Sequence, residues 1–457
     1  MEYLDFIKSK KPKTIQTGFK LPSSHINSNA FDYQAEIIER ACLNGRYALF
    51  MDTGLGKSIC QMNFADAVHR HTNKDVLMLA PLAVSYQMVQ EGKKFGYELN
   101  HCKSQNEVKK GLNITNYESL HKFDTSHFVG IVLDESSILK GFDSKTRKTL
   151  TEGFNQTRFK LACTATPSPN DFVELGTHSE FLGNFTVSEM KMMYFTQDRA
   201  NVQDYILKGH AEAEFWEWIA SWAECISSPY DLGYDGSSHI LPSLNELYHE
   251  ISHDDTSYLS NGYLFEFSES NATTIGKNKR KTIEKRAEKV ASLQDGKPHL
   301  VWCDTNDEAD KLKEAMPYAV EVRGNHKDEY KAEMALAFAN GEIGTLISKA
   351  SIFGYGLNLQ NAHNMTFTGL NYSYESYYQA IRRMWRFGQK EEVNVNIIIA
   401  DNERSILDSI HRKKAQHEKM KRSMLEAVLS AKKRNNLKID VFKDFTIPNF
   451  IYSKGIK

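Results

Sequence analysis

The residues best suited to chemistry lie in the segment Asp52–Ser58, which reads DTGLGKS. Glycines beside a lysine and a serine let backbone N–H groups approach a phosphate, because glycine has no side chain in the way. In such a loop Lys57 would reach the β- and γ-phosphates, and the Ser58 hydroxyl would hold Mg²⁺. An apolar run precedes the loop and a helical pattern follows it, so the helix dipole would add attraction for an anion. The segment predicts nucleotide binding, although Met51 replaces the first glycine of the longer motif G-x-x-x-x-G-K-[ST].

Two adjacent carboxylates, Asp134 and Glu135, follow an apolar run further along the chain. In a hydrolytic nucleotide site Asp134 would hold Mg²⁺ through its water shell, and Glu135 would orient or deprotonate the attacking water. Thr164 and Thr166 end another apolar run, and their hydroxyls would couple such a site to its surroundings. The carboxylates alone also fit a solvated loop, and the threonines also fit a turn before Pro167. Their order after a phosphate loop favours the hydrolytic interpretation.

A third group of polar residues lies in the segment Tyr378–Gln389, which reads YQAIRRMWRFGQ. Gln379, Arg383 and Arg386 have i, i+4, i+7 spacing, which predicts one helical face with two guanidinium groups. The interleaved Trp and Phe are poor composition for a merely solvated face. Two cations delivered to the γ-phosphate from a second lobe would act as arginine fingers, which raise rates by about 10³–10⁵.

Short apolar runs alternate with helical patterns along the chain, and these elements must position the residues named above. This alternation predicts βαβ units and parallel sheets. The fold class expected is α/β, with two lobes whose parallel sheets are flanked by helices. Strands are expected at 47–51, 76–80, 129–133, 159–163, 300–303, 344–348, 365–368 and 393–399, and helices at 58–71, 84–95, 307–315, 327–339 and 374–385. The domains expected are a tail (1–30), a first lobe (31–184), a largely helical insertion and linker (185–290), a second lobe (291–403) and a basic helical extension (404–457).

Composition excludes several classes of protein. The chain has 457 residues, and 57 basic against 58 acidic residues give a net charge of -1. Its longest apolar stretch, 76–84, is too short to cross a bilayer, and no signal peptide is visible, so we expect a cytoplasmic protein. The scattered cysteines argue against zinc ribbons and disulfide frameworks.

Charge is distributed unevenly along the chain. The segment 404–457 has 14 Lys/Arg against 5 Asp/Glu, and a basic run lies at Lys277–Lys281. A net charge near zero therefore does not exclude binding to nucleic acid.

The order of motifs resembles the Snf2-like branch of superfamily 2 helicases, most of all its compact members from bacteriophages and prophages. The motifs are DTGLGKS, LAPLAV, ITNYES, LDESS, CTATP, GYGLNLQ and QAIRRMWRFGQ. The resemblance covers the chain from Phe31 to about Asp401 and implies two RecA-like lobes, with ATP and Mg²⁺ between them and double-stranded DNA across both. Two departures are Ser136–Ser137, where the related box has a histidine, and Ala165, where glycine is more usual.

The resemblance also implies roles for single residues, and Gln34 would read the adenine. The nucleotide-binding positions are Gln34, Thr53, Gly54, Leu55, Gly56, Lys57, Ser58, Gly356 and Gln379, and the catalytic positions are Lys57, Asp134, Glu135, Arg383 and Arg386. The metal would be held by Ser58 and Asp134. Sequence-independent contacts with DNA phosphates are expected at Pro81, Ser85, Asn116, Tyr117, Arg323 and Lys349.

The function expected is an ATP-driven motor that translocates on double-stranded DNA as its lobes close and open. One alternative is a strand-separating helicase on DNA or RNA, and another is a non-motor clamp or mediator that uses ATP for DNA binding. A metabolic kinase explains nothing beyond residue 170. We expect the motor to be monomeric and, if it is phage-encoded, to act in the bacterial host cytoplasm. A replication or recombination protein is a partner compatible with this role.

Overall fold

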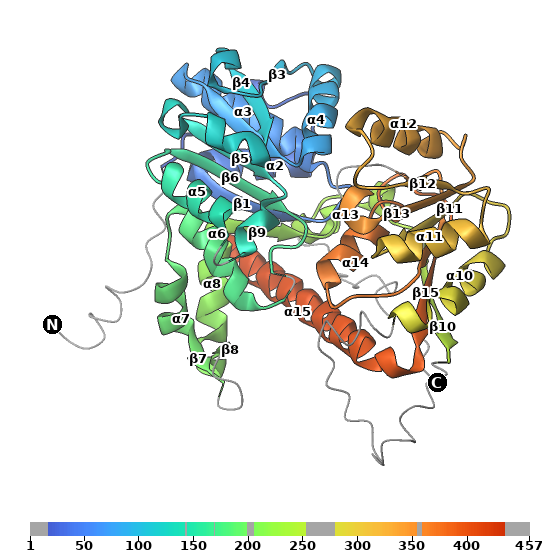
Figure 1. Ribbon diagram of the computed structural model, residues 1–457. Helices are drawn as coiled ribbons and strands as arrows, with labels where there is room; N and C mark the ends of the chain where they lie inside the picture. Colours follow the sequence, from blue (N-terminus) through green and yellow to red (C-terminus); the bar gives the residue numbers. More distant parts are fainter. Residues whose placement is uncertain are drawn as a thin grey trace. The chain divides into compact units, whose positions relative to one another are not determined.

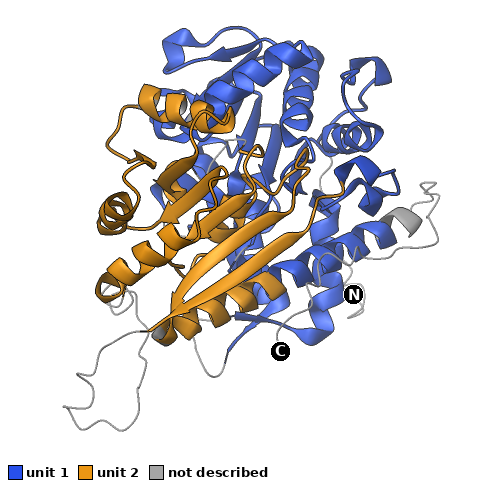
Figure 2. Ribbon diagram, turned by 90° about the vertical axis from the view of Figure 1, so that its right-hand side faces the viewer, with its two compact units in different colours: residues 1–239, 416–443 blue, residues 240–415, 444–457 orange. Residues whose placement is uncertain are grey.

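The computed structural model divides the chain into two compact units, coloured separately in Figure 2. Unit 1 comprises Met1–His239 and Gln416–Lys443, and unit 2 comprises Ile240–Ala415 and Asp444–Lys457. The residues that the structure describes are 17–141, 144–168, 170–198, 205–252, 279–353 and 359–434.

Unit 1 contains a seven-stranded sheet in which every neighbouring pair of strands is parallel. In spatial order its strands are β3 (Leu99–His101), β4 (Leu112–Asn116), β2 (Val76–Ala80), β5 (Gly130–Asp134), β6 (Phe159–Thr164), β1 (Arg46–Met51) and β9 (Ala223–Ile226). Parallel strands covered on both faces are continuous apolar runs, as in VLMLA of β2, where all five residues are buried.

Alternate strand residues of unit 1 feed two apolar cores, one on each face of the sheet. One face is covered by α2 (Asp32–Asn44), α3 (Lys57–Thr72) and α4 (Leu82–Phe95) (Figure 1). The other is covered by α5 (Lys145–Gly153), α6 (Leu175–Leu182), α8 (Glu212–Trp222) and the C-terminal part of α15 (Arg404–Arg434). Unit 1 also contains α7 (Val187–Tyr194) and an antiparallel pair of strands, β7 (Phe195–Gln197) and β8 (Tyr205–Leu207).

Unit 2 contains a six-stranded sheet that is also parallel throughout. In spatial order its strands are β10 (Leu244–Ile251), β15 (Val393–Ala400), β14 (Asn364–Phe367), β11 (His299–Cys303), β13 (Thr345–Lys349) and β12 (Val320–Val322). Its helices are α10 (Ile283–Ser292) and α11 (Asn306–Ala315), which share one core, and α12 (Asp328–Ala339), α13 (Ala350–Phe353), α14 (Tyr374–Ile381) and the start of α15, which contribute to the other.

Short 3₁₀ helices fill many of the connections. They are η1 (Ser23–His25), η2 (Gln105–Glu107), η3 (Tyr117–Lys122), η4 (Thr125–His127), η5 (Ser136–Lys140), η6 (Phe172–Glu174), η7 (Gly209–Ala211), η8 (Pro229–Leu232), η9 (Ser237–His239) and η11 (Asp401–Glu403). None of the helices in the described part of the chain combines the length and apolar composition needed to cross a membrane.

The two parallel sheets flanked by helices confirm the predicted α/β class with two lobes. The stretch 185–290 differs from the predicted helical insertion, because it adds β9 to the sheet of unit 1 and β10 to that of unit 2. Both strands lie at a sheet edge, and β9 has only four residues while β10 is largely polar. Such strands lack the long apolar run on which the prediction depended.

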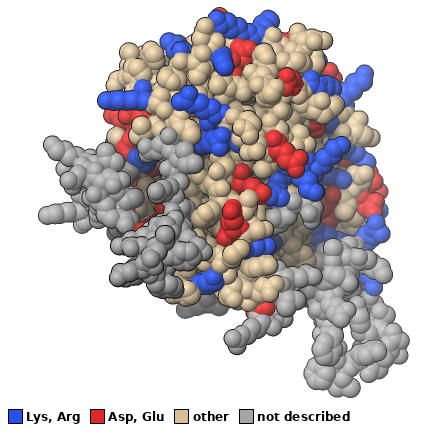
Figure 3. Space-filling view, turned by 90° about the vertical axis from the view of Figure 1, so that its left-hand side faces the viewer, with Lys and Arg blue, Asp and Glu red and all other residues tan. Residues whose placement is uncertain are grey.

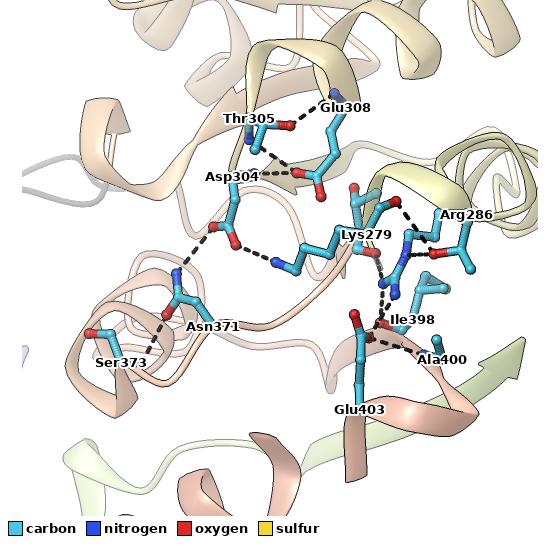
Figure 4. A network of polar contacts seen from close by, with 12 residues as sticks. Lys279, Arg286, Asp304, Thr305, Glu308, Asn371, Ser373, Ile398, Ala400 and Glu403 are labelled. Atoms are coloured by element: carbon cyan, nitrogen blue, oxygen red, sulfur yellow. Dashed lines mark hydrogen bonds and ion pairs between the residues drawn. The ribbon is translucent and has the colours of Figure 1, made fainter. Parts of the chain in front are cut away.

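A buried ion pair fixes α10 to the sheet of unit 2 (Figure 4). Arg286, fully buried on α10, pairs with Glu403 at 2.6 Å and donates to the Thr368 and Ile398 carbonyls at 2.9 and 3.3 Å. Close by, Lys279 Nζ contacts the Asp304 carboxylate at 2.6 Å. Lys279 belongs to the basic run Lys277–Lys281 of the sequence, but it is buried and its charge is paired with Asp304.

We predict that Arg286→Met destabilises the protein by about 3–5 kcal/mol, because Glu403 would be left as a buried carboxylate without its cation. The matched control is Lys311→Met on α11, whose ion pairs with Glu284 and Glu314 are more exposed. It should leave the urea midpoint almost unchanged. Urea unfolding followed by circular dichroism tests both variants, and equally small shifts would contradict the assignment.

Candidate nucleotide-binding site

The order of the strands brings the predicted functional groups of unit 1 together at the carboxyl ends of its strands. Strands β5, β6 and β1 are neighbours, and Phe50 of β1 is in register with Thr164 of β6. Asp134 of β5 is in register with Cys163, also on β6. Because all three strands are parallel, the loops that follow them lie side by side, the usual position for a ligand in an α/β sheet. The phosphate loop, the carboxylates and the two threonines therefore converge.

The phosphate loop joins β1 to α3 through two glycines with positive φ angles. Gly54 has φ 94° and Gly56, which caps the N-terminus of α3, has φ 77°. A Cβ atom at Gly56 would lie 2.2 Å from Nε2 of Gln34, so no other residue fits without moving that side chain. Thr53 lies in the turn before Gly54. The loop thus ends at a helix N-terminus, where unpaired N–H groups bind anions.

Lys57 is held by backbone oxygens of its own loop. Its Nζ donates to the carbonyls of Met51 at 2.8 Å and Asp52 at 3.3 Å. Burial lowers the pKa of Lys57, and the nearby carboxylates of Glu135 and Asp134 oppose that shift. An ammonium group that donates to neutral carbonyls and whose charge is opposed by burial can move to a phosphate at modest cost.

Asp134 is fixed at the end of β5 by two neighbouring side chains. Gln61 Nε2, on α3, donates to its carboxylate at 2.8 Å, and the Tyr117 hydroxyl donates to its backbone carbonyl at 2.6 Å. Burial raises the pKa of Asp134 to about 6. Ser58 lies one helical turn before Gln61, so a hydroxyl and a carboxylate flank the phosphate loop. This set of oxygen ligands suits Mg²⁺, which binds few protein groups and keeps several waters.

Glu135 adopts the left-handed backbone conformation, with φ 57° and ψ 57°. This conformation costs a non-glycine residue about 1–2 kcal/mol. Thr164 donates its hydroxyl to the Glu135 carboxylate at 2.6 Å and accepts the N–H of Thr166 at 3.0 Å. This contact links the end of β6 to the carboxylate that follows β5.

Sequence reasoning missed a histidine beside this group. The hydroxyl of Ser136, the residue after Glu135, contacts His178 Nε2 of α6 at 3.1 Å. Burial lowers the pKa of His178 to about 3, so the imidazole is neutral. Nothing in the local sequence around His178 distinguished it from an ordinary helix residue.

Gln34 lies under the phosphate loop. Its Nε2 donates to the Leu55 carbonyl at 2.9 Å, and its Oε1 accepts the Phe31 N–H at 2.9 Å. Tyr33 also donates to the Leu55 carbonyl at 3.0 Å and contacts His239 at 3.3 Å. Tyr33 and His239 were missed because they carry no motif of their own. The reading of adenine by Gln34 stays a prediction.

The second group of predicted residues belongs to unit 2. Gln379 lies on α14, but that helix ends at Ile381, so the prediction that Arg383 and Arg386 share its face is wrong. In the turn that follows, Gln389 Nε2 donates to the carbonyl of Met384 at 3.3 Å and to those of Gln360 and Ala362, each at 3.0 Å. The roles of Gln379, Arg383 and Arg386 stay predictions, and Gly356 lies outside the described residues.

The predicted DNA contacts fall into two sets. Pro81 and Asn116 cap α4 and η3, and Lys349 ends β13, while Arg323 pairs with Asp310 and Glu321. Ser85 and Tyr117 are buried, and their hydroxyls donate to the carbonyls of Leu82 at 2.7 Å and Asp134 at 2.6 Å. We therefore do not carry Ser85 and Tyr117 forward as direct contacts.

The distribution of charge on one face of the molecule is mixed. In Figure 3, Lys and Arg side chains alternate with Asp and Glu side chains among the described residues. Among the described residues of this face, no large patch of one sign is visible.

Comparison with known families identifies the class of both units. Residues 27–169 match the family model described as "Type III restriction enzyme, res subunit", and residues 279–388 match "Helicase conserved C-terminal domain". The chain carries the two domains of a superfamily 2 helicase, and these domains imply ATP binding and hydrolysis. A search of curated proteins returned no significant match.

Among solved structures, the chain is similar to the Sulfolobus solfataricus SWI2/SNF2 ATPase core in complex with dsDNA. The two share 17% sequence identity with a TM-score of 0.42, and the match covers 91% of this chain and 98% of that one.

The contact between Thr164 and Glu135 gives a sharp prediction. Thr164→Val keeps the shape of the side chain but removes the hydrogen bond to the carboxylate, which is worth about 1.5–3 kcal/mol. We expect kcat for ATP to fall by about 10- to 150-fold with KM little changed. Thr164→Ser, which keeps the hydroxyl, is the matched control and should retain most activity. Equal rates for the Val and Ser variants would exclude this role for Thr164.

Proposed function

We propose that this chain is a DNA-dependent ATPase of the Snf2-like type that translocates on double-stranded DNA. The observation that carries the proposal is the convergence of Lys57, Asp134 and Glu135 on neighbouring strand ends, in a chain with both helicase domains. A nucleotide-binding clamp needs the phosphate loop alone. The Glu135 carboxylate, held by Thr164, supports hydrolysis.

In the proposed reaction Lys57 binds the β- and γ-phosphates, and Ser58 and Asp134 would hold Mg²⁺. A metal held there would supply positive charge next to the phosphates. Glu135 orients the attacking water and takes its proton. Arg383 and Arg386 of unit 2 would stabilise the charge on the transferred phosphate, and Gln379 would contribute to nucleotide binding.

Translocation on duplex DNA is proposed from the segments GLNLQ and Q-A-x-x-R-x-x-R-x-G-Q, which the chain shares with that branch. Pro81, Asn116, Arg323 and Lys349 are the proposed contacts with DNA phosphates. A replication or recombination protein is a compatible partner. The main alternative is a strand-separating helicase, and efficient unwinding of a forked duplex without triplex displacement would favour it.

The test is the steady-state ATPase rate without nucleic acid and with duplex DNA, single strands or RNA. We expect the largest stimulation with duplex DNA, and a steep loss of stimulation as salt rises, because phosphate contacts release counterions. Lys57→Ala should abolish turnover in every condition, whereas the surface variant Lys74→Ala should retain the basal rate. A rate that no polymer changes would refute the motor, and the strongest response to RNA would favour the alternative.

A further inference from the structure

The C-terminal helix α15 is part of the core of unit 1 from Gln416 onward. Met420 and Met424 are fully buried, and both belong to the apolar cluster that contains Trp222 and Phe215. The sequence predicted this stretch as a basic extension, yet its apolar face is anchored against the sheet. The position of the basic residues between these methionines is therefore fixed.

One of those basic residues, Lys421, forms an ion pair with Asp52. The Lys421 side chain is 17% exposed and that of Asp52 is 11% exposed, so the pair is largely shielded from water. Asp52 is the first residue after β1 and opens the phosphate loop. The C-terminal helix thus contacts the nucleotide site directly within unit 1.

Asp52 is held from several sides. Its N–H donates to the Ile226 carbonyl at 3.0 Å, which ties the loop to the end of β9. Its own carbonyl accepts the Leu55 N–H at 3.4 Å and Lys57 Nζ at 3.3 Å. Any shift of Asp52 would therefore be transmitted to the catalytic lysine and to the turn that precedes Gly56.

Electrostatic attraction also links Asp52 to Lys57. The Asp52 carboxylate is one of the groups that raise the pKa of Lys57 and so attract its ammonium. A phosphate must draw that ammonium away from Asp52. When Lys421 neutralises Asp52, the competition for Lys57 weakens and the buried carboxylate is itself stabilised.

We propose that Lys421 is a positioning residue of the nucleotide site, which holds Asp52 and leaves Lys57 available for the phosphates. This inference rests on the proposed ATPase function. The C-terminal helix is then a structural component of the hydrolytic site, distinct from any role of the basic tail in binding nucleic acid.

The test compares Lys421→Met with Lys419→Met, a control on the same helix. Lys419 pairs with Glu212 at 2.9 Å on the surface, and its side chain is 59% exposed. We expect Lys421→Met to raise KM and the dissociation constant of a fluorescent ATP analogue about tenfold. Lys421→Arg should bind within about twofold of the unsubstituted protein, because it keeps the charge. Lys419→Met should leave both values unchanged.

The double variant Asp52→Asn/Lys421→Met separates positioning from folding. Removing both charges should restore most of the lost affinity, because the loss comes from an Asp52 carboxylate whose charge Lys421 no longer neutralises. If Lys421→Met alone does not fold, the nucleotide affinity of the double variant still tests the inference. Unchanged nucleotide affinity in Lys421→Met, or no recovery in the double variant, would overturn the inference. If the unsubstituted protein hydrolyses no ATP, the proposed function fails as well.

Discussion

The site depends on one constraint, namely that β5, β6 and β1 are parallel neighbours. Parallel strands end at the same edge of a sheet, so residues far apart in the chain meet without any long-range motif. The register of Phe50 with Thr164 and of Asp134 with Cys163 makes this arrangement specific. A slip of one residue would turn each strand's side chains to the opposite face and separate the carboxylates from the loop.

At the carboxyl ends of these strands, some local conformations and buried charges are unfavourable in free energy. The packing of the sheet must offset this cost. Glu135 holds a left-handed backbone, and burial acts against the charged forms of both Lys57 and Asp134. Such strain and perturbed pKa values gather at functional sites, because the surrounding fold fixes groups that would otherwise relax. The partly buried hydrogen bonds of Gln61 with Asp134 and of Thr164 with Glu135 hold these groups in place.

Much of the fold could be predicted from the sequence, because long apolar runs such as 76–80 and 159–163 leave little choice but a buried parallel strand. The edge strands β9 and β10 could not, since they are short or polar and acquire their structure from pairing. The end of α14 at Ile381 also escaped prediction, because the i, i+4, i+7 spacing of Gln379, Arg383 and Arg386 fits a longer helix. Similarly, the pairing of Lys421 with Asp52 joins residues that only the tertiary fold brings together.

The most direct test of the central claim is a single-turnover measurement with Glu135→Gln. This change keeps the size of the side chain and its hydrogen bond with Thr164, but removes the base next to Lys57 and Asp134. The account predicts that ATP still binds with nearly normal affinity while its cleavage slows by about 10²-fold or more. Cleavage at the unsubstituted rate would contradict the assignment of the hydrolytic site to these strand ends.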